Sequence, residues 1–349
     1  MDKRARVRLL LEGLAAGDSL GSTSEFVPQR RMPAHYAQQR QSGWPFRQVG
    51  GGMFDWRPGQ ATDDTDMALC LALSFVERGR FDGEDVANRF VQWMRTGPRD
   101  VGGTTARTLS CVARGTPWHE SGLTEFHRNP PGAANGSLMR NGVVAGMADD
   151  LHDAFRISAC QSLPTHYAPL PVICCAAQTY LAWELLEGRR PFDARWTEAF
   201  EEAFCAWLNG VRDPICRQWR ENVKDRLPDA WATFRQATFD ADRFNPFQTD
   251  FTGRAGYAVL TLQIAVWAAA WSLRDAAFPA VPIGFPDEVL GRTGPWTLAW
   301  VVMVGHDSDT YGATAGPLIA AAHNGLPPEL TCGLEAMSQY DAAVAYASR

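Results

Sequence analysis

Residues 62–77 read TDDTDMALCLALSFVE, and the second half of this stretch indicates the fold class. From Asp66 to about Glu77 nearly every residue is apolar, which predicts a helix at the centre of the molecule. Strand-like alternation is scarce in the rest of the chain, and no β-α-β rhythm occurs. Further helices are expected at 84–96, 104–114, 137–149, 151–160, 169–187, 194–209, 256–273, 295–304 and 311–324. We therefore predict an all-α fold with long connecting loops.

The 349 residues are expected to form one domain, 1–349, because no internal repeat, low-complexity tract or linker divides them. An N-terminal amphipathic helix should be closed by Gly17 and then Gly21. Residues 27–61 are rich in Gly, Pro, Arg and Gln and should form a long functional loop. The polar, irregular stretch 211–254 is the candidate insertion or mobile lid.

Composition and charge exclude several classes of protein. The net charge is −6 and no dense Lys/Arg block occurs, so a nucleic-acid-binding face is not expected. The eight cysteines include no C-x-x-C pair, which is typical of buried thiols in a reducing, cytoplasmic compartment. The N-terminus lacks the apolar block of a signal peptide. The uncharged stretch 255–273 is long enough to span a membrane, but no second span accompanies it, which favours a buried core helix.

Two short acidic clusters stand out, TDDTD at 62–66 and DSDT at 307–310. Each comes directly before an apolar helix, so helix capping is the simplest alternative explanation. Capping needs only one or two such residues, whereas closely spaced carboxylates repel one another unless a cation is bound. Carboxylate and hydroxyl oxygens without His or Cys suit Mg²⁺ or Mn²⁺ rather than Zn²⁺ or copper. The pair of clusters suggests a two-metal site that holds substrate hydroxyls and activates a water.

Two Gly-rich segments lie between these clusters, DVGGTT at 100–105 and GAANGSLMR at 132–140. Each could present backbone N–H groups at the start of a helix, an arrangement that binds phosphate. Neither fits the P-loop pattern or a strand-borne G-x-G-x-x-G, which excludes those nucleotide sites. The alternative is that each segment is only a turn at a helix entry, with Asp100 as an N-cap.

These motifs resemble those of the ADP-ribosylglycohydrolase family, of the dinitrogenase-reductase-activating glycohydrolase and ADP-ribosylarginine hydrolase type. The matching segments are GDSLG (17–21) with EF (25–26), PGQATDDT (58–65), GGTT (102–105), AANGSLMR (133–140), TH (165–166) and HDSDT (306–310). They occur in the family's order across nearly the whole chain, and such a series is highly specific. The resemblance implies an all-α fold around a two-metal centre, usually of magnesium or manganese.

Carried over residue by residue, the resemblance also implies roles for single side chains. Glu25 would lie close to the metals and contact the ribose or assist proton transfer, and Asp100 would meet the guanidinium of an arginine leaving group. Asp63 would complete this catalytic set, and His166 would line the cleft. The implied metal ligands are Thr62, Asp63, Asp64, Asp307, Asp309 and Thr310. The implied contacts to the diphosphate and neighbouring ribose are Gly102, Gly103, Thr104, Thr105, Asn135, Gly136 and Ser137.

The activity that the resemblance implies is metal-dependent hydrolysis of the bond between ADP-ribose and arginine on a modified protein. The implied partners are that protein and a cognate ADP-ribosyltransferase, whereas neither a membrane nor a nucleic acid is expected. One alternative is a hydrolase of serine-, nucleic-acid- or small-molecule-linked ADP-ribose. Another is a non-catalytic relative that binds ADP-ribose or a toxin, against which the intact acidic clusters argue.

Several aromatic residues bear on the substrate. His306 stands where the family commonly has a small residue, and Tyr311 stands where a smaller polar residue is frequent, so both could reshape the mouth of the site. Trp44, Phe54 and Trp56 lie in the early loop and are candidates for stacking on a base.

Overall fold

All regular structure in the described part of the chain is helical. The computed structural model describes residues 1–129, 132–193, 195–274, 276–278 and 284–348. Within these ranges the α-helices are α1 (Lys3–Gly21), α2 (Met32–Gln39), α3 (Asp63–Arg78), α4 (Gly83–Arg95), α5 (Gly103–Ala113), α6 (Ser121–Arg128), α7 (Val144–Met147), α8 (Leu151–Ser162), α9 (Pro169–Leu186), α10 (Trp196–Gly210), α11 (Pro214–Val223), α12 (Leu227–Gln236), α13 (Ala258–Ser272), α14 (Asp287–Leu290), α15 (Thr297–Val302), α16 (Ser308–His323), α17 (Pro328–Thr331) and α18 (Glu335–Ala347). Five short 3-10 turns and two isolated β-bridges occur in the same ranges, and no strand does. The all-α prediction is confirmed.

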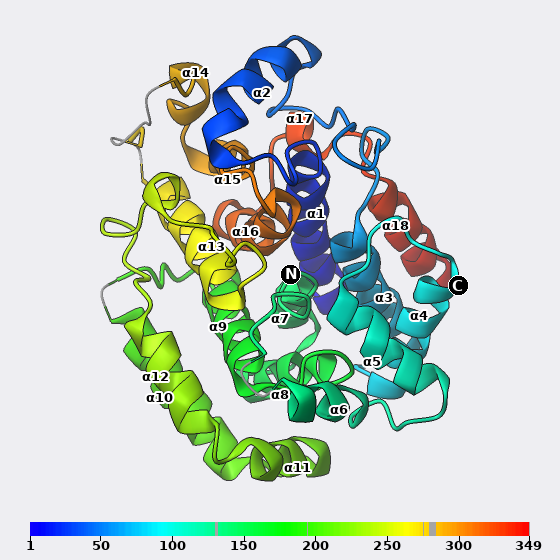
Figure 1. Cartoon of the computed structure of the whole chain (residues 1–349). Coiled ribbons are helices and arrows are strands. Elements are labelled where there is room, and N and C mark those ends of the chain that lie inside the picture. The colour runs from blue at the N-terminus through cyan, green and yellow to red at the C-terminus, as the bar shows by residue number, and fades with distance from the viewer. Residues whose placement is uncertain (130–131, 194, 275, 279–283, 349) are drawn as a thin grey trace.

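Helices α1 and α16 lie against each other in the middle of the molecule (Figure 1). Glycines one turn apart on α1 face the backbone of α16. A Cβ atom built on Gly17 would lie 2.0 Å from the carbonyl oxygen of Gly312, and one built on Gly21 would lie 2.2 Å from that of Ser308. The two helices are therefore antiparallel and in backbone contact. This contact places the end of α1 beside the start of α16, where the late acidic cluster lies.

Other helices cover this central pair on two sides (Figure 1). Helices α3, α4, α5 and α18 follow on one side, with α3 packed on α1. Helices α9 and α13 follow on the other, with both packed on α16. Every residue of α13 is buried, as expected for the uncharged stretch that contains it. Among the described residues, no helix has the length and apolarity needed to cross a membrane.

Several sequence-based boundaries are wrong. Gly17 lies inside α1 rather than closing it. The loop expected at 27–61 contains α2, and the helix expected at 137–149 is reduced to a 3-10 turn and α7. The stretch 211–254, expected to be irregular, contains α11 and α12. Their apolar faces are buried while the rest of each helix is polar, so the average composition concealed the helical pattern. Helices α6, α14, α17 and α18 were not expected.

Candidate functional site

A cavity of about 490 Å³ opens where α1, α3, α5 and α16 come together. This volume lies within the range of small-molecule sites in proteins. Most of the residues predicted from the sequence line it. They are Glu25, Asp63, Asp100, Gly102, Gly103, Thr104, Thr105, Asn135, Gly136, His166, Asp307, Asp309 and Thr310.

One group of carboxylates is assembled from three helix ends. Asp18 lies in the last turn of α1, Asp64 in the first turn of α3 and Asp309 in the first turn of α16. One oxygen from each of the three lies within 4.8 Å of the other two. The backbone contact between α1 and α16 holds Asp18 and Asp309 in this position.

A second group shares one member with the first. Glu25 follows α1 and Asp100 precedes α5, and one oxygen of each lies within 4.8 Å of the other and of an Asp309 oxygen. Asp309 therefore belongs to both groups. Asp63 adds a further carboxylate to the cavity wall. Four short segments from both halves of the chain thus bring their acidic residues to one place.

Burial makes the charged form of these carboxyl groups costly. Burial raises the pKa of Asp18 to about 7, and burial followed by the charge of Asp100 raises the pKa of Glu25 to about 9. The pKa of Asp64 and that of Asp309 are raised well above the ordinary value, first by burial and then by neighbouring carboxylates. Each shift therefore reflects a buried acidic group whose negative charge is not balanced by a neighbouring positive charge.

Some of these carboxylate oxygens also lack hydrogen-bond donors. Within the described ranges, no group donates to Asp18 Oδ1, Glu25 Oε2, Asp64 Oδ1 or Asp309 Oδ1, although all four atoms are buried. Unpaired buried oxygens are rare and costly in proteins. A divalent cation prefers such hard oxygen ligands and would offset their mutual repulsion. The two groups could therefore hold small, hard cations.

Asp18 is a functional candidate that the sequence analysis did not single out. Its Oδ2 accepts hydrogen bonds from the backbone nitrogens of Thr62 and Thr65, each at 3.1 Å, and from the Thr65 hydroxyl. It therefore fixes the first turn of α3 against α1. The available signal was a single acidic residue in the GDSLG motif, within the buried C-terminal half of α1.

Asn135 holds the carboxylate of Asp307 at the cavity wall. Its Nδ2 donates to Asp307 Oδ2 at 2.7 Å and to Thr261 Oγ1 at 2.9 Å. Burial raises the pKa of Asp307 to about 6, while hydrogen bonds from Asn135 and Thr310 lower it. Asp307 thus has a partner of its own, unlike the orphaned oxygens of the two groups.

Helix α5 begins at the edge of the cavity without a side-chain cap. Its N-cap is Gly102, to which no side chain contributes a capping bond, so Asp100 is not the cap. The N–H groups of a first helical turn have no partner inside the helix. Gly103, Thr104 and Thr105 form that turn and line the cavity. The start of α5 can therefore bind an anionic group such as phosphate.

A buried arginine fixes the opposite wall. Arg140 donates to the Gly136 carbonyl at 3.1 Å, to Gln161 Oε1 at 2.9 Å and to Thr165 Oγ1 at 2.8 Å. The same Thr165 oxygen lies 2.9 Å from His166 Nδ1. A Cβ atom on Gly136 would lie 2.8 Å from the His166 ring, so the ring can pack here only against glycine. Burial, and then the charge of Arg140, lowers the pKa of His166 to about 3 and keeps the ring neutral.

Three predicted residues do not line the cavity. Thr62 is the N-cap of α3 and accepts a hydrogen bond from the Asp64 backbone nitrogen. Asp64 is fully buried beside Asp18. Ser137 lies in the core, where its hydroxyl accepts a hydrogen bond from Ser162 at 2.8 Å. The cavity also has lining residues that were not predicted, which are Phe26, Ala134, Met139, Ala255 and Gly256.

None of the three proposed stacking residues, Trp44, Phe54 and Trp56, lines this cavity. Trp44 is 1% exposed and donates to the Leu20 carbonyl, and Trp56 lines a smaller cavity of about 200 Å³ that shares Asp63 and Asp100 with the first. Phe26 lines the main cavity, is exposed, and packs edge-on against Phe54.

The two departures from the family pattern lie in different places. His306 lines the cavity and stacks on Phe251, with ring centroids 4.4 Å apart. Tyr311 is fully buried, and its hydroxyl donates to the Ala255 carbonyl at 2.9 Å. Only His306 therefore reaches the cavity directly.

Known proteins resemble this chain along its length. A family model described as ADP-ribosylglycohydrolase matches residues 1–349. An ADP-ribosylarginine hydrolase of Pseudomonas putida (strain GB-1) is 30% identical over 338 residues, which cover 93% of this chain and 72% of that protein. An ADP-ribosyl-[dinitrogen reductase] glycohydrolase of Rhodospirillum rubrum is 33% identical over 179 residues, which cover 51% of this chain and 56% of that protein. A solved structure titled ADP-ribosylglycohydrolase-related protein complex shares the fold, with a TM-score of 0.64 and 24% identity over 99% of this chain and 98% of that one.

Proposed function

Because the chain belongs to the ADP-ribosylglycohydrolase family of hydrolases, we propose that it hydrolyses the N-glycosidic bond between ADP-ribose and a modified arginine side chain of a protein. The reaction would reverse mono-ADP-ribosylation and would depend on two cations, Mg²⁺ or Mn²⁺. The partners would be the modified protein and the transferase that modifies it. The eight free thiols support a reducing, cytoplasmic setting.

The observation that carries this proposal is the position of Asp309 in two carboxylate groups at once. A shared carboxylate between two groups of oxygen ligands suits a pair of neighbouring cations, and the orphaned buried oxygens of both groups fit that use. When bound, such cations would supply Lewis acidity and hold the ribose hydroxyls. Asp18, Asp64 and Asp309 would hold one cation, and Asp309 with Glu25 would hold the other.

The rest of the cavity suits ADP-ribose. The uncapped start of α5 can receive the diphosphate through backbone N–H groups. Gly136 and the His166 ring packed against it form the opposite wall, which would face a sugar. Phe26 at the mouth offers an exposed aromatic ring to a base. These contacts would orient the bond to be cleaved toward the carboxylates.

Asp100 supports arginine as the leaving group. A guanidine leaves readily only in its protonated form, and a carboxylate beside it keeps it cationic through a charge-assisted hydrogen bond. Asp100 is half-buried, lines the cavity and does not cap α5, so its carboxylate is free for such a contact. It also lies within 4.8 Å of Glu25 and Asp309, which gives it a second possible role as a cation ligand.

The test is to incubate the full chain with arginine-, serine- and base-linked ADP-ribose and to follow the release of ADP-ribose, with and without a chelator. We expect release from the arginine-linked substrate, loss of that activity on chelation and its return with Mg²⁺ or Mn²⁺. Release from another linkage alone would reject arginine specificity. ADP-ribose binding without turnover on any linkage would instead indicate the non-catalytic alternative, and full activity with chelator would reject the cation requirement.

A further inference from the structure

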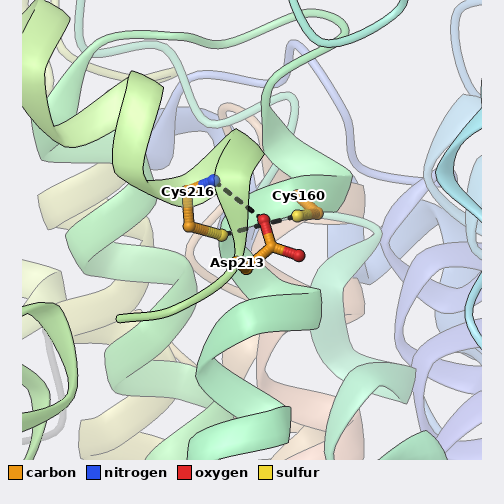
Figure 2. Close-up of side chains that lie close together, drawn as sticks. All are labelled: Cys160, Asp213 and Cys216. Carbon is orange, nitrogen blue, oxygen red and sulfur yellow. Dashed lines mark hydrogen bonds between the residues drawn. The ribbon is translucent and has the colours of Figure 1, made fainter. Parts of the chain in front are cut away.

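A second cluster of metal-binding side chains lies away from the acidic cavity. Cys160 comes from the last turns of α8, while Asp213 and Cys216 come from the start of α11, and Figure 2 shows the three side chains turned toward one another. The two Sγ atoms are 3.6 Å apart, and one ligand atom of each residue lies within 4.8 Å of the other two. Cys160 is 2% exposed and Cys216 is fully buried. None of the three residues lines the acidic cavity.

We propose that Cys160, Cys216 and Asp213 form a site for a thiophilic divalent cation such as Zn²⁺. Two sulfur ligands at about 2.3 Å from a tetrahedral ion lie about 3.8 Å from each other. The observed Sγ–Sγ separation is close to this value, so a cation could enter with little movement of α8 or α11. Two sulfurs and one carboxylate oxygen differ in chemistry from the all-oxygen donors of the cavity. The two sites would therefore select different ions.

Asp213 can serve this site while it also caps α11. Its Oδ1 accepts a hydrogen bond from the Cys216 backbone nitrogen at 2.9 Å, which satisfies the first turn of the helix. A carboxylate has a second oxygen and further lone pairs, so capping and cation binding are compatible. Asp213 also lines a surface cavity of about 520 Å³, which gives an ion a route to the buried sulfurs.

The fourth ligand would be water. His152 is the histidine that lines the same surface cavity as Asp213. It precedes Cys160 by two turns of α8, and the helical rise separates the two positions by about 12 Å. The histidine therefore cannot reach an ion held by the sulfurs. Three protein ligands and one water still complete a tetrahedral shell.

The cation would join α8 to α11, and α11 contacts the segment that carries His166. Helix α11 holds the residue next to His166, because Trp219 Nε1 donates to the Tyr167 carbonyl at 2.9 Å and Asn222 Nδ2 donates to the Tyr167 hydroxyl at 2.9 Å.

The decisive experiment titrates the reduced full chain with Co²⁺ and measures the thiolate-to-cobalt charge-transfer absorption. We expect this band in the wild-type protein and its displacement by Zn²⁺. Co²⁺ bound by the carboxylates of the main cavity gives no such band, because those ligands are oxygens. Cys160→Ser and Cys216→Ser should each abolish it, while Cys174→Ser, at a buried thiol outside the cluster, should retain it.

Asp213→Asn separates cation binding from folding. Asparagine caps a helix about as well as aspartate, so the melting temperature of the metal-free variant should match that of wild type. Its affinity for Co²⁺ should nevertheless fall by about tenfold or more. Absence of the band in reduced wild type, or its persistence in both cysteine variants, would overturn the proposal. Loss of two hydrogens in intact mass under mild peroxide, with no Co²⁺ bound by the reduced protein, would identify a redox-active pair instead.

Discussion

Gly17 of α1 and Gly312 of α16 face each other with no side chain between them. A Cβ atom on Gly17 would lie 2.0 Å from the Gly312 carbonyl oxygen, and one on Gly312 would lie 2.2 Å from that of Gly17. No rotamer can relieve such an overlap, because both partners are backbone. The position of Asp18 relative to Asp309 depends on this contact.

Gly17→Ala should therefore destabilise the protein although alanine favours helices. Separation of α1 from α16 should lower the free energy of unfolding by about 1–3 kcal/mol or more. Gly210→Ala is the matched control, because Gly210 ends α10 and a Cβ atom there meets nothing within 4 Å. Denaturant unfolding of both variants checks the prediction, and equal stability of the two would show that the helices can move apart freely.

Asp309→Ala should abolish both catalysis and cation binding, since Asp309 belongs to both carboxylate groups. Activity should fall by more than about 100-fold, because even residues behind a metal's ligands contribute about 10- to 100-fold. The metal-free variant should fold normally, because one buried, repelling carboxylate has gone. Calorimetry with Mn²⁺ and thermal melts measure the two effects, with exposed Asp225→Asn as the control. If the variant is unfolded even with Mn²⁺, the role of the Asp309 carboxylate is structural.

Asp100→Asn tests the two roles of this carboxylate. If Asp100 contacts the guanidinium, the variant should lose about 1.5–3 kcal/mol of transition-state stabilisation. The rate of hydrolysis of arginine-linked ADP-ribose should then fall roughly ten- to hundred-fold. The affinities for free ADP-ribose and for Mn²⁺ should then stay close to wild type. A parallel loss of Mn²⁺ affinity would instead identify Asp100 as a cation ligand. Unchanged hydrolysis would show that Asp100 is neither a guanidinium partner nor a cation ligand.

Gly103→Val tests the anion site at the start of α5. Free ADP-ribose should raise the melting temperature of wild type by mass action, and the bulky side chain should abolish this increase by covering the backbone N–H groups. The variant should still fold, because the atom nearest to an added Cβ is the flexible guanidinium of Arg107 at 3.2 Å. Calorimetry that gives the same ADP-ribose affinity in both proteins would exclude the α5 terminus as the phosphate site.

His166 should make stability depend on pH in a defined direction. Its folded-state pKa of about 3 is below the ordinary value of 6.5, so the unfolded chain alone takes up a proton as the pH falls below 6.5. The free energy of unfolding therefore loses this contribution progressively between pH 6.5 and pH 3. The decrease in melting temperature from about pH 7 to about pH 5 should be smaller in His166→Gln than in wild type. Identical pH profiles would mean that the ring already accepts a proton in the folded state.

The sequence was most informative where the chemistry is local. Asp63, Asp64 and Asp309 lie in short clusters of carboxylates and hydroxyls, and the repulsion within such clusters is visible without a fold. Asp18 was missed because its partners, Thr62 and Thr65, lie far along the chain and meet it only after α3 packs on α1. The sequence alone shows one isolated acidic residue there.

The direction of a side chain was harder to predict than its place in a motif. Ser137 follows Gly136, which lines the cavity, but the Ser137 hydroxyl points into the core. The sequence does not give the turn geometry of this segment, so it cannot show which of the two residues faces the cavity and which faces the core. Helix α11 was missed for a different reason, because its polar residues outnumber the few apolar ones, Trp219 and Val223 among them, that contact the core.

The glycine contact between α1 and α16 also has a consequence for synthesis. The two helices lie near opposite ends of the described chain, so α1 leaves the ribosome long before α16 exists. Its glycine face must remain without its native partner until α16 has been translated. Contacts so distant in sequence form slowly, because closing a long loop costs conformational entropy before the contact is gained. The acidic cavity therefore cannot be complete in a nascent chain that lacks Asp309.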